Sequence, residues 1–329
     1  MVALADPLAL QDIEPYLTAV DDLFARELSS DLDHVQKLTT HVERFRGKML
    51  RPVLVFLSGL AARKNAQPLG TTHVTIATVV EMVHAATLIH DDVLDNAEIR
   101  RRGATVNHLH GNETAVLLGD LLISHAYHLC SGLDSQIASR AIGRTTNIVC
   151  EGELTQNFNR GNWALTEATY YDIIYRKTAS LIETSCRLGA WASDADAATI
   201  EALGTYGREV GMAFQIVDDL LDIAGRQKTV GKSLGTDIEK GKLTLPMIHF
   251  LATAAPSHRQ LLISLLESET SDRIDNVRQL LIPSASMRYA RNQAQQRIDQ
   301  AIAAISILAE SKIRQTLINM AHFVTAREL

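Results

Sequence analysis

Apolar residues recur along this chain at intervals of three and four rather than two. Ile76, Val79, Val80 and Val83 form one such series. A spacing of three and four places side chains on one face of an α-helix, whereas a spacing of two is typical of a strand. No Asn-Gly or Asp-Gly turn lies between alternating apolar runs, so signals for hairpins are nearly absent. The pattern predicts an all-α protein.

Seven prolines fall between the periodic segments, where they mark the ends of helices. No low-complexity linker or charge block separates the segments, which favours a single helical domain over residues 1–329. We expect helices near residues 9–29, 33–45, 52–64, 71–96, 112–131, 134–157, 166–190, 195–224, 242–254, 258–266, 271–281, 284–308 and 310–326.

The composition is that of a soluble globular protein, because 46% of the residues are hydrophobic and 21% are charged. The formal net charge of −6 argues against a nucleic-acid-binding protein, which needs an excess of basic residues on one face. A polyanionic ligand would therefore need a local basic cluster or bridging cations.

Three cysteines are too few and too widely spaced for a disulfide framework or a zinc site. Cys130, Cys150 and Cys186 are therefore expected to be buried, reduced thiols of an intracellular protein. The N-terminus lacks a basic region before its apolar stretch, so it does not match a signal peptide. No run approaches the roughly 20 apolar residues of a membrane span, and we expect no transmembrane segment.

Two aspartate motifs stand out, DDVLD at 91–95 and DDLLD at 218–222. Residues four apart share a helix face, so Asp91 projects with Asp95 and Asp218 with Asp222. Like charges at that spacing cost a helix about 0.2–0.5 kcal/mol a pair, and a divalent cation is the simplest group to offset the cost. Each motif directly follows an apolar stretch, which favours the rim of a core helix over a solvated polar face. Mg²⁺ is typically held by such carboxylates together with substrate phosphates.

Basic residues that could bind a diphosphate lie beside the predicted helices. Arginine binds phosphate through its two-pronged guanidinium group and lysine through a point charge. The candidates are Lys48 and Arg51 in RGKMLRP, Arg100 to Arg102 after the first motif, Lys177 in YRKTAS, and Lys232 and Lys242 around GTDIEKGK.

The ordered set of motifs resembles the trans-isoprenyl diphosphate synthase (polyprenyl synthase) family. The resemblance rests on GKMLRP at 47–52, HAATLIHDDVLDNAEIRRRG at 84–103, EGELTQ at 151–156, YRKTA at 175–179, QIVDDLLD at 215–222 and GKSLGTDIEKGKLTLP at 231–246. It implies an all-α fold of the isoprenoid synthase type with a deep central active-site cavity. It also implies repeated addition of isopentenyl diphosphate to an allylic diphosphate.

Residue roles follow from the same resemblance. Asp91, Asp95 and Asp218 are expected to bind about three Mg²⁺ ions, assisted by Asp92, Asp219 and Asp222. These aspartates, with Lys177 and Lys232, form the expected catalytic set. The allylic diphosphate is expected on Arg100, Lys177, Thr178, Gln215, Lys232 and Lys242, and isopentenyl diphosphate on Lys48, Arg51, His84 and Arg101. The chain departs from the family pattern at Arg46 and Arg102, where glycines are usual.

Product length in this family depends on the residues that precede the first aspartate motif. A bulky aromatic residue four or five places before it gives short products, and this chain has Thr87 and Ala86 there. Val83 and Met82 continue the same region. Each added five-carbon unit gains roughly 4 kcal/mol when buried, at about 0.8 kcal/mol per carbon. We therefore expect a long product, roughly C35 to C50, with a C15 or C20 product as the alternative.

Other interpretations of the motifs are also open. Glu81 and His84 form the Glu-x-x-His element of di-iron bundles, although no second such pair occurs. A class I terpene cyclase shares the first aspartate motif, but it usually lacks the second and has no isopentenyl diphosphate site. A non-catalytic synthase subunit would be expected to have lost one motif, and both are intact.

The family resemblance also implies a homodimer, the commonest symmetric assembly. We expect a cytoplasmic protein that could associate with a membrane through its product.

Overall fold

The computed structural model describes residues 11–44, 47–63, 67–100, 103–225 and 235–326, apart from the side chain of Arg44. Within these ranges the chain is helical except for one two-stranded antiparallel hairpin. The elements in order are α2 (Glu14–Glu27), α3 (Asp33–Arg44), α4 (Leu50–Ala62), α5 (Thr71–Leu94), β1 (Ile99–Arg100), β2 (Gly103–Ala104), α6 (Val106–His110), α7 (Asn112–Ser131), α8 (Gln136–Phe158), α9 (Glu167–Ile174), the π-helix η1 (Tyr175–Ala179), α10 (Ser180–Trp191), α11 (Ala197–Ala224), α13 (Thr236–Glu239), α14 (Leu245–Thr253), α15 (Pro256–Glu267), α16 (Arg273–Leu281), α17 (Ala285–Ala304), the 3₁₀ turn η2 (Ile305–Ile307) and α18 (Lys312–Thr325).

The chain divides into two compact units. Unit 1 comprises Met1–Asn147, Leu181–Gly207 and Ala304–Met320, and unit 2 comprises Ile148–Ser180, Arg208–Ala303 and Ala321–Leu329. The first aspartate motif belongs to unit 1 and the second to unit 2. The prediction of a single domain stays a prediction.

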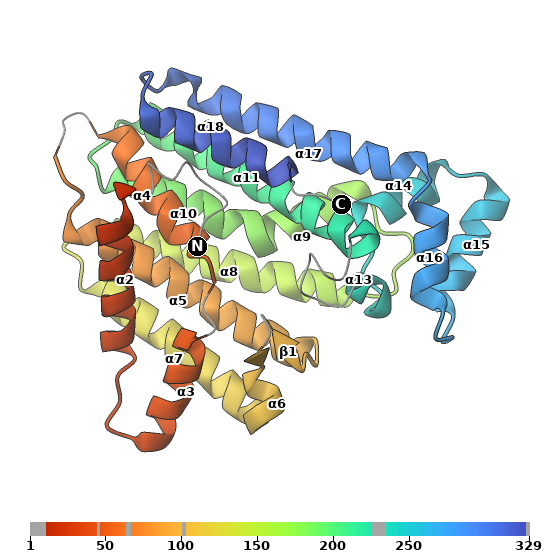
Figure 1. The fold of residues 1–329 in the computed structure, drawn as a ribbon, viewed down its shortest axis with the longest axis horizontal. Coiled ribbons are helices and arrows are strands. Elements are labelled where there is room, and N and C mark those ends of the chain that lie inside the picture. The colour runs from red at the N-terminus through yellow and green to blue at the C-terminus, as the bar shows by residue number, and fades with distance from the viewer. Residues whose placement is uncertain (1–10, 45–46, 64–66, 101–102, 226–234, 327–329) are drawn as a thin grey trace. The chain divides into compact units, whose positions relative to one another are not determined.

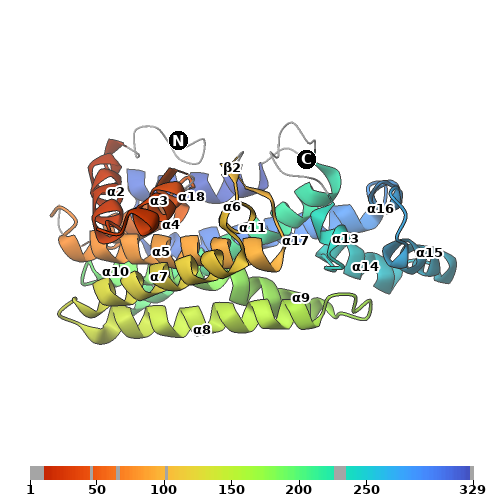
Figure 2. The same cartoon turned by 90° about the horizontal axis from the view of Figure 1, so that it is seen from below.

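Helix α5 is the core of unit 1. Its sequence is apolar around most of its circumference, with Ile76, Val80, Met82 and Ala86 fully buried, and a helix of this kind is stable only when covered on several sides. Helices α2, α4, α6 and α7 all contact it. Figures 1 and 2 show α7 lying alongside α5 for most of its length. The packing fixes the helix that carries the first aspartate motif.

Unit 2 is organised around α14, which contacts α9, α15 and α16. Proline occupies the first turn of both α14 and α15, where its missing N–H costs no hydrogen bond. Helices α15 and α16 lie side by side in both views (Figures 1 and 2). The C-terminal turns of α11, with the second aspartate motif, belong to this unit.

The long helices agree with those expected from the periodic pattern. The segment expected as one helix at 166–190 instead consists of α9, the π-helix η1 and α10. The hairpin and the short helices α6 and α13 were not expected, because elements of two to five residues are too short to show a period.

Helix α5 bears on the expectation that no run approaches the length of a membrane span. It is, among the described residues, the one helix long and apolar enough to cross a membrane, and 61% of that stretch is buried inside the protein. A buried core helix passes the same length and composition test as a membrane span.

The cysteines correct one expectation from the sequence. Cys130 and Cys186 are buried as expected, whereas Cys150 is exposed on α8. Burial raises the pKa of the Cys130 thiol to about 11 and that of Cys186 to about 12.

Candidate active site

The first aspartate motif forms the C-terminal end of α5. The helix ends at a C-cap residue, Asp95, followed by Asn96 in the left-handed conformation with φ 48°. The Ala97 N–H donates to the Asp92 carbonyl (2.9 Å) and the Asn96 N–H to the Val93 carbonyl (3.2 Å). This pair of bonds is a Schellman motif, which satisfies carbonyls that the helix end leaves open. It fixes where the helix stops relative to its aspartates.

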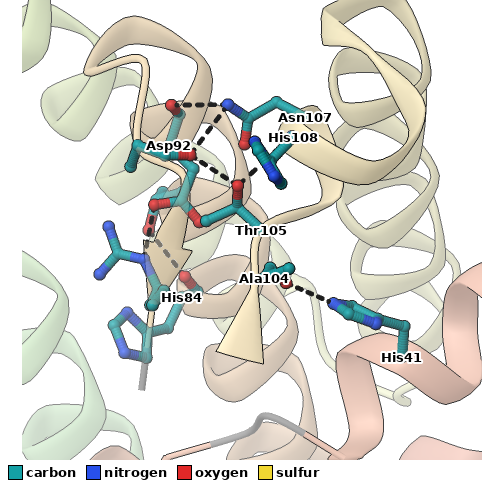
Figure 3. Close-up of polar contacts among 10 residues, drawn as sticks. His41, His84, Asp92, Ala104, Thr105, Asn107 and His108 are labelled. Carbon is teal, nitrogen blue, oxygen red and sulfur yellow. Dashed lines mark hydrogen bonds and ion pairs between the residues drawn. The ribbon is translucent and has the colours of Figure 1, made fainter. Parts of the chain in front are cut away.

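Asp92 points inward and is held by protein groups. Its side chain is buried, and its Oδ1 accepts a hydrogen bond from the Arg100 Nε of β1 at 2.6 Å. Burial raises the pKa of the Asp92 carboxyl, and the Arg100 guanidinium opposes that rise. The Asn107 amide donates to the backbone carbonyls of Asp92 and Ala97, tying α6 to the end of α5 (Figure 3). Asp91 and Asp95, in contrast, are half-buried.

A pocket lies beside this end of α5. Its floor is α5 and the β-hairpin, and α3 contributes His41, whose Nε2 lies 3.0 Å from the Ala104 carbonyl oxygen (Figure 3). The pocket brings together two residues predicted to bind diphosphates, His84 and Arg100. Its lining residues are His41, Val42, Gly47, Glu81, His84, Ala85, Leu88, Ile89, Asp92, Arg100, Ala104, Thr105 and Val106.

The GKMLRP segment begins beside that pocket and leads into α4. Gly47 lines the pocket, Lys48 is exposed, and Arg51 is half-buried in the first turn of α4. Met49, the N-cap of α4, has φ 53° and ψ 39°, a left-handed conformation that side-chain-bearing residues rarely adopt. Strained backbone of this kind concentrates at functional sites. Arg101, a further predicted contact of isopentenyl diphosphate, lies outside the described residues, as do Arg46 and Arg102.

The second aspartate motif lies in the last turns of α11. The Asp219 side chain is 5% exposed and accepts two hydrogen bonds, from the Tyr170 hydroxyl of α9 (2.7 Å) and from the Gln215 amide (2.8 Å). Burial raises the pKa of Asp219 well above its ordinary value, and the same effect raises the pKa of Tyr170. Gln215 in turn accepts a hydrogen bond from the Thr178 hydroxyl at 2.9 Å. A chain of hydrogen bonds therefore links α9, α11 and the π-helix.

Asp222 braces the segment that follows α11. Its Oδ1 accepts hydrogen bonds from the Thr236 hydroxyl (2.9 Å) and backbone N–H (3.2 Å), and its Oδ2 from the Asp237 N–H (3.1 Å). Asp218, one turn earlier, is half-buried. Lys232, predicted to act in catalysis, lies outside the described residues.

The π-helix η1 carries Lys177 and Thr178. A π-turn inserts one extra residue into a helix and is frequent at functional sites. Helix α8 approaches it closely at Gly152, where an added Cβ would lie 2.7 Å from the Arg176 Cβ and 2.9 Å from the Lys177 nitrogen. Lys177 Nζ pairs with Glu153 Oε1 at 2.5 Å and donates to Gln156 Oε1 at 3.2 Å, both on α8.

A second pocket collects these groups within unit 2. Four residues predicted to bind the allylic diphosphate line it: Lys177, Thr178, Gln215 and Lys242. Asp219 and Asp237 are acidic groups in its wall, and burial with the nearby Asp222 raises the pKa of Asp237 to about 6, while Lys242 opposes the rise. The remaining lining residues are Gln156, Asn159, Leu165, Tyr170, Ile173, Ile174, Leu243 and Thr244.

The residues predicted to set product length lie on α5, before the first motif. Met82, Val83 and Ala86 are buried, and the half-buried Thr87 donates its hydroxyl to the His84 carbonyl at 2.8 Å. Among the described residues, the pocket beside α5 is lined by Ala85 and Leu88 and by none of these four. Their role in product length stays a prediction.

Divalent cations could bind at the half-buried aspartates. No group of three or more His, Cys, Asp or Glu side chains forms a ready-made metal cage within the described parts of the chain. Mg²⁺ does not need one, since it keeps several waters and combines one or two carboxylates with substrate phosphates. Asp91, Asp95 and Asp218 are partly accessible carboxylates and fit that kind of binding.

Comparison with known proteins identifies the family. The sequence profile described as Polyprenyl synthetase matches residues 33–281. The chain belongs to the polyprenyl synthetase family. It is therefore a prenyltransferase, and its all-α architecture is the isoprenoid synthase fold.

Similarity to individual members of the polyprenyl synthetase family extends over nearly the whole chain. Octaprenyl diphosphate synthase of Escherichia coli K12 is 32% identical over 313 residues, covering 95% of this chain and 96% of that protein. A short chain isoprenyl diphosphate synthase of Methanothermobacter thermautotrophicus is also 32% identical, over 98% and 99% of the two chains. The crystal structure of polyprenyl synthase from Caulobacter crescentus CB15, complexed with calcium and isoprenyl diphosphate, has a TM-score of 0.90 at 30% identity and covers 99% of both chains.

The structure adds residues that had no assigned role in the sequence analysis. Tyr170, Glu153, Gln156 and Asp237 all contact predicted site residues. Glu153 and Gln156 lie in EGELTQ and Asp237 in GTDIEKGK, so their motifs were noticed without a function for these positions. Tyr170 lies outside every motif, and only the fold brings it to Asp219.

Proposed function

We propose that this chain is an all-trans polyprenyl diphosphate synthase that adds isopentenyl diphosphate repeatedly to an allylic diphosphate and makes a long product, roughly C35 to C50. One observation carries the proposal: Lys177, Thr178, Gln215 and Lys242 line a single pocket together with Asp219 of the second aspartate motif. The sequence spreads these residues over 66 positions, from 177 to 242. A diphosphate is the ligand that two lysines and several hydrogen-bond donors in one pocket suit best.

The allylic diphosphate would bind in the unit 2 pocket. Lys177 and Lys242 supply positive charge there, and Thr178 supplies a hydroxyl donor. Gln215 is oriented by its bond to the buried Asp219, so its side chain is held before substrate arrives. Preorganised donors of this kind stabilise charge on a leaving group without the cost of reorienting.

Isopentenyl diphosphate would bind in the unit 1 pocket. His84 lines it, and Gly47 brings the start of GKMLRP to its edge, with Lys48 and Arg51 next along the chain. Arg100, which the family resemblance assigns to the allylic diphosphate, also lines this pocket and pairs with the buried Asp92, so it has a structural role there as well. We propose Arg101 as a further contact from its sequence position.

Asp91, Asp95 and Asp218 would bind Mg²⁺, about three ions in all, each ion also held by diphosphate oxygens. When bound, such ions act as Lewis acids that stabilise the negative charge developing on the departing pyrophosphate. Asp92, Asp219 and Asp222 would assist by holding the motif ends in place, since their carboxylates bond Arg100, Tyr170 and Thr236.

The residues must bind and orient the two substrates and exclude water. Cleavage of the allylic carbon–oxygen bond leaves pyrophosphate and an allylic cation, which the isopentenyl double bond attacks. Lys177 and Lys242, with Lys232 proposed from its sequence position, would stabilise the leaving pyrophosphate. The final proton would pass to that pyrophosphate, because no side chain in the motifs is dedicated to accepting it.

The long product is proposed from Ala86 and Thr87. In this family a bulky aromatic residue at these positions would block the growing chain, and this protein has a small and a medium-sized residue there. The octaprenyl relative is consistent with a long product, and the short-chain relative of equal identity shows that overall similarity does not decide the length.

A homodimer and a cytoplasmic location complete the proposal. Helix α7 exposes Val116, Leu117 and Tyr127, and Leu117 is 68% exposed, which suits a surface covered by a second copy. The light-scattering mass of the purified protein in solution would test the dimer, and a monomer mass would exclude it.

Incubation of purified protein with farnesyl diphosphate, labelled isopentenyl diphosphate and Mg²⁺, followed by sizing of the products, tests the activity. We expect a ladder that ends between C35 and C50. Products that stop at C15 or C20 would mean a short-chain synthase, a cyclised hydrocarbon would mean a terpene cyclase, and no product would support a non-catalytic subunit.

A further inference from the structure

Lys177 is bound by an acidic side chain of its own protein. Its ammonium group lies 2.5 Å from Glu153 Oε1, and the two side chains are only 21% and 20% exposed. An ion pair shielded from water is stronger than one on the surface, where screening leaves at most about 1 kcal/mol. The lysine that the proposed function assigns to the allylic diphosphate is therefore already paired.

The two α8 partners of Lys177 differ in their relation to the pocket. Gln156 lines the pocket in unit 2, whereas Glu153, one helical turn earlier, is not among the lining residues. Lys177 Nζ lies between them, at 3.2 Å from Gln156 Oε1 and 2.5 Å from Glu153 Oε1. The closer partner of the ammonium is therefore the residue that does not line the pocket.

A diphosphate and Glu153 carry charge of the same sign and need the same ammonium. Lysine is a point charge with three donors on a flexible stem, so it can change partners without backbone movement. Each contact that Lys177 makes with a diphosphate weakens its contact with Glu153, so the two anions compete for one ammonium group.

We propose that Glu153 competes with the allylic diphosphate and with product pyrophosphate for Lys177, and so lowers the affinity of the pocket for both. Glu153 is a positioning residue in this proposal, since it acts on substrate through Lys177. Glu153 would therefore speed product release. Pyrophosphate must leave the pocket after every added unit, so an internal anion that competes for Lys177 would raise turnover. The inference rests on the proposed function, because it needs Lys177 to bind the diphosphate.

Glu151 provides a matched control on the same helix. It is exposed, and it pairs with Arg176 on the surface at 2.5 Å, next to Lys177 in sequence. Glu151→Gln removes the same charge from the same helix without touching the Lys177 pair. Neither Glu151 nor Arg176 lines the pocket.

The test measures binding of inorganic pyrophosphate with Mg²⁺ by calorimetry, and KM and kcat for farnesyl diphosphate. Glu153→Gln keeps the size of the side chain and removes its charge. We expect its Kd for pyrophosphate and its KM to fall by about fivefold, because Lys177 no longer has to leave a carboxylate in order to bind the ligand. We expect kcat to fall as well, since pyrophosphate leaves more slowly. Glu151→Gln should match the unaltered protein in all three.

The Lys177→Met variant distinguishes a failure of this inference from a failure of the proposed function. In that background Glu153→Gln should no longer tighten pyrophosphate binding, because there is no ammonium to compete for. If Lys177→Met leaves pyrophosphate binding unchanged, the assignment of Lys177 fails and the inference fails with it.

Lys177→Met could weaken pyrophosphate binding while Glu153→Gln weakens it or leaves it unchanged. In that case the assignment of Lys177 stands and only the proposed competition is wrong. A circular dichroism melt of each variant shows whether it is folded. Should Glu153→Gln be unfolded, the same measurements on Glu153→Ala decide between these outcomes.

Discussion

Asp92 and Asp219 occupy the same place in their two motifs and share one environment. Each is the second aspartate, each is buried, and each is bonded to protein groups: Asp92 to Arg100, and Asp219 to Tyr170 and Gln215. A buried carboxylate costs free energy unless it is paired or hydrogen-bonded. These partners account for both residues as anchors of the motif ends.

Removal of the Tyr170 hydroxyl tests this anchoring. Tyr170→Phe keeps the ring in its buried position but takes one of two donors from Asp219. A hydrogen bond to a charged group is worth about 1.5–3 kcal/mol, so we expect a lower melting temperature and about a tenfold loss of kcat/KM for the allylic diphosphate. Tyr171→Phe is the control, since the neighbouring Tyr171 hydroxyl bonds Gln293 rather than an aspartate. Equal effects of the two variants would contradict the anchoring.

The raised pKa of Asp237 predicts how the stability of the metal-free protein depends on pH. Burial raises the pKa of Asp237 from 3.8 to about 6. Between these two pH values, the folded protein keeps a proton on Asp237 that the unfolded chain has released. The contribution of Asp237 to the free energy of unfolding is therefore fully favourable below about pH 4 and is lost as pH rises through 6. Denaturant unfolding in EDTA should show a shallower fall in stability from pH 4 to 7 for Asp237→Asn. An unchanged slope would mean that Asp237 is not perturbed.

Ala86→Tyr tests the proposed control of product length. A tyrosine ring at this position would block the proposed elongation path, and we expect the longest product to shorten to C15 or C20 while the first condensation continues. Sizing of the product ladder measures the change, and the rate with farnesyl diphosphate shows that the variant is folded and active. An unaltered ladder would remove Ala86 from the elongation path.

At the level of single residues, the site could be predicted from the sequence only in part. The aspartates, Lys177 and Lys242 could be named because charge and spacing mark them, and four predicted ligands do line one pocket. The hydrogen-bond partners of these residues could not be predicted, since Tyr170 bonds Asp219 across 49 positions of sequence. A neutral side chain that becomes important only through a distant contact leaves no local pattern.

At the scale of elements, the π-helix η1 is the feature that periodicity concealed. The segment at 166–190 keeps its helical spacing, yet the structure inserts a π-turn at the YRKTA motif. A single extra residue barely alters a pattern of three and four. The long helices were predictable because each has many apolar positions, whereas the hairpin and the π-turn depend on tertiary contacts.

Gly152→Ala tests whether the π-helix requires the close approach of α8. The new methyl group would lie 2.7 Å from the Arg176 Cβ, so one of the two helices must shift and Lys177 and Thr178 with it. We expect a lower melting temperature and at least about a tenfold higher KM for the allylic diphosphate, comparable to a small misplacement of binding groups.

Gly143→Ala provides the control on the same helix. Its methyl group would meet only the Tyr127 ring at an ordinary 3.8 Å. Since alanine is favoured over glycine in a helix by about 0.8–1 kcal/mol, this variant should be neutral or slightly more stable. If Gly152→Ala behaved like Gly143→Ala, the π-helix would not depend on Gly152.

At the scale of the whole molecule, the fold places each aspartate motif at the end of a long buried helix. Helices α5 and α11 are covered by apolar contacts through most of their length and become accessible at Asp91, Asp95 and Asp218. Helix ends held this firmly can present carboxylates at fixed positions, which is the requirement for binding a metal–diphosphate complex. The family, and the order of its motifs, were predictable from sequence because the motifs are charged and widely separated.

Turnover of Asp91→Ala and Asp218→Ala at saturating Mg²⁺ tests the central claim most directly. Loss of a carboxylate that holds a cation on the diphosphate should lower kcat with farnesyl diphosphate by about 100-fold or more in each variant. Asp134→Ala, at an exposed position between α7 and α8, should retain full activity. Near-normal turnover of either motif variant, with the protein folded and Mg²⁺ saturating, would contradict the account.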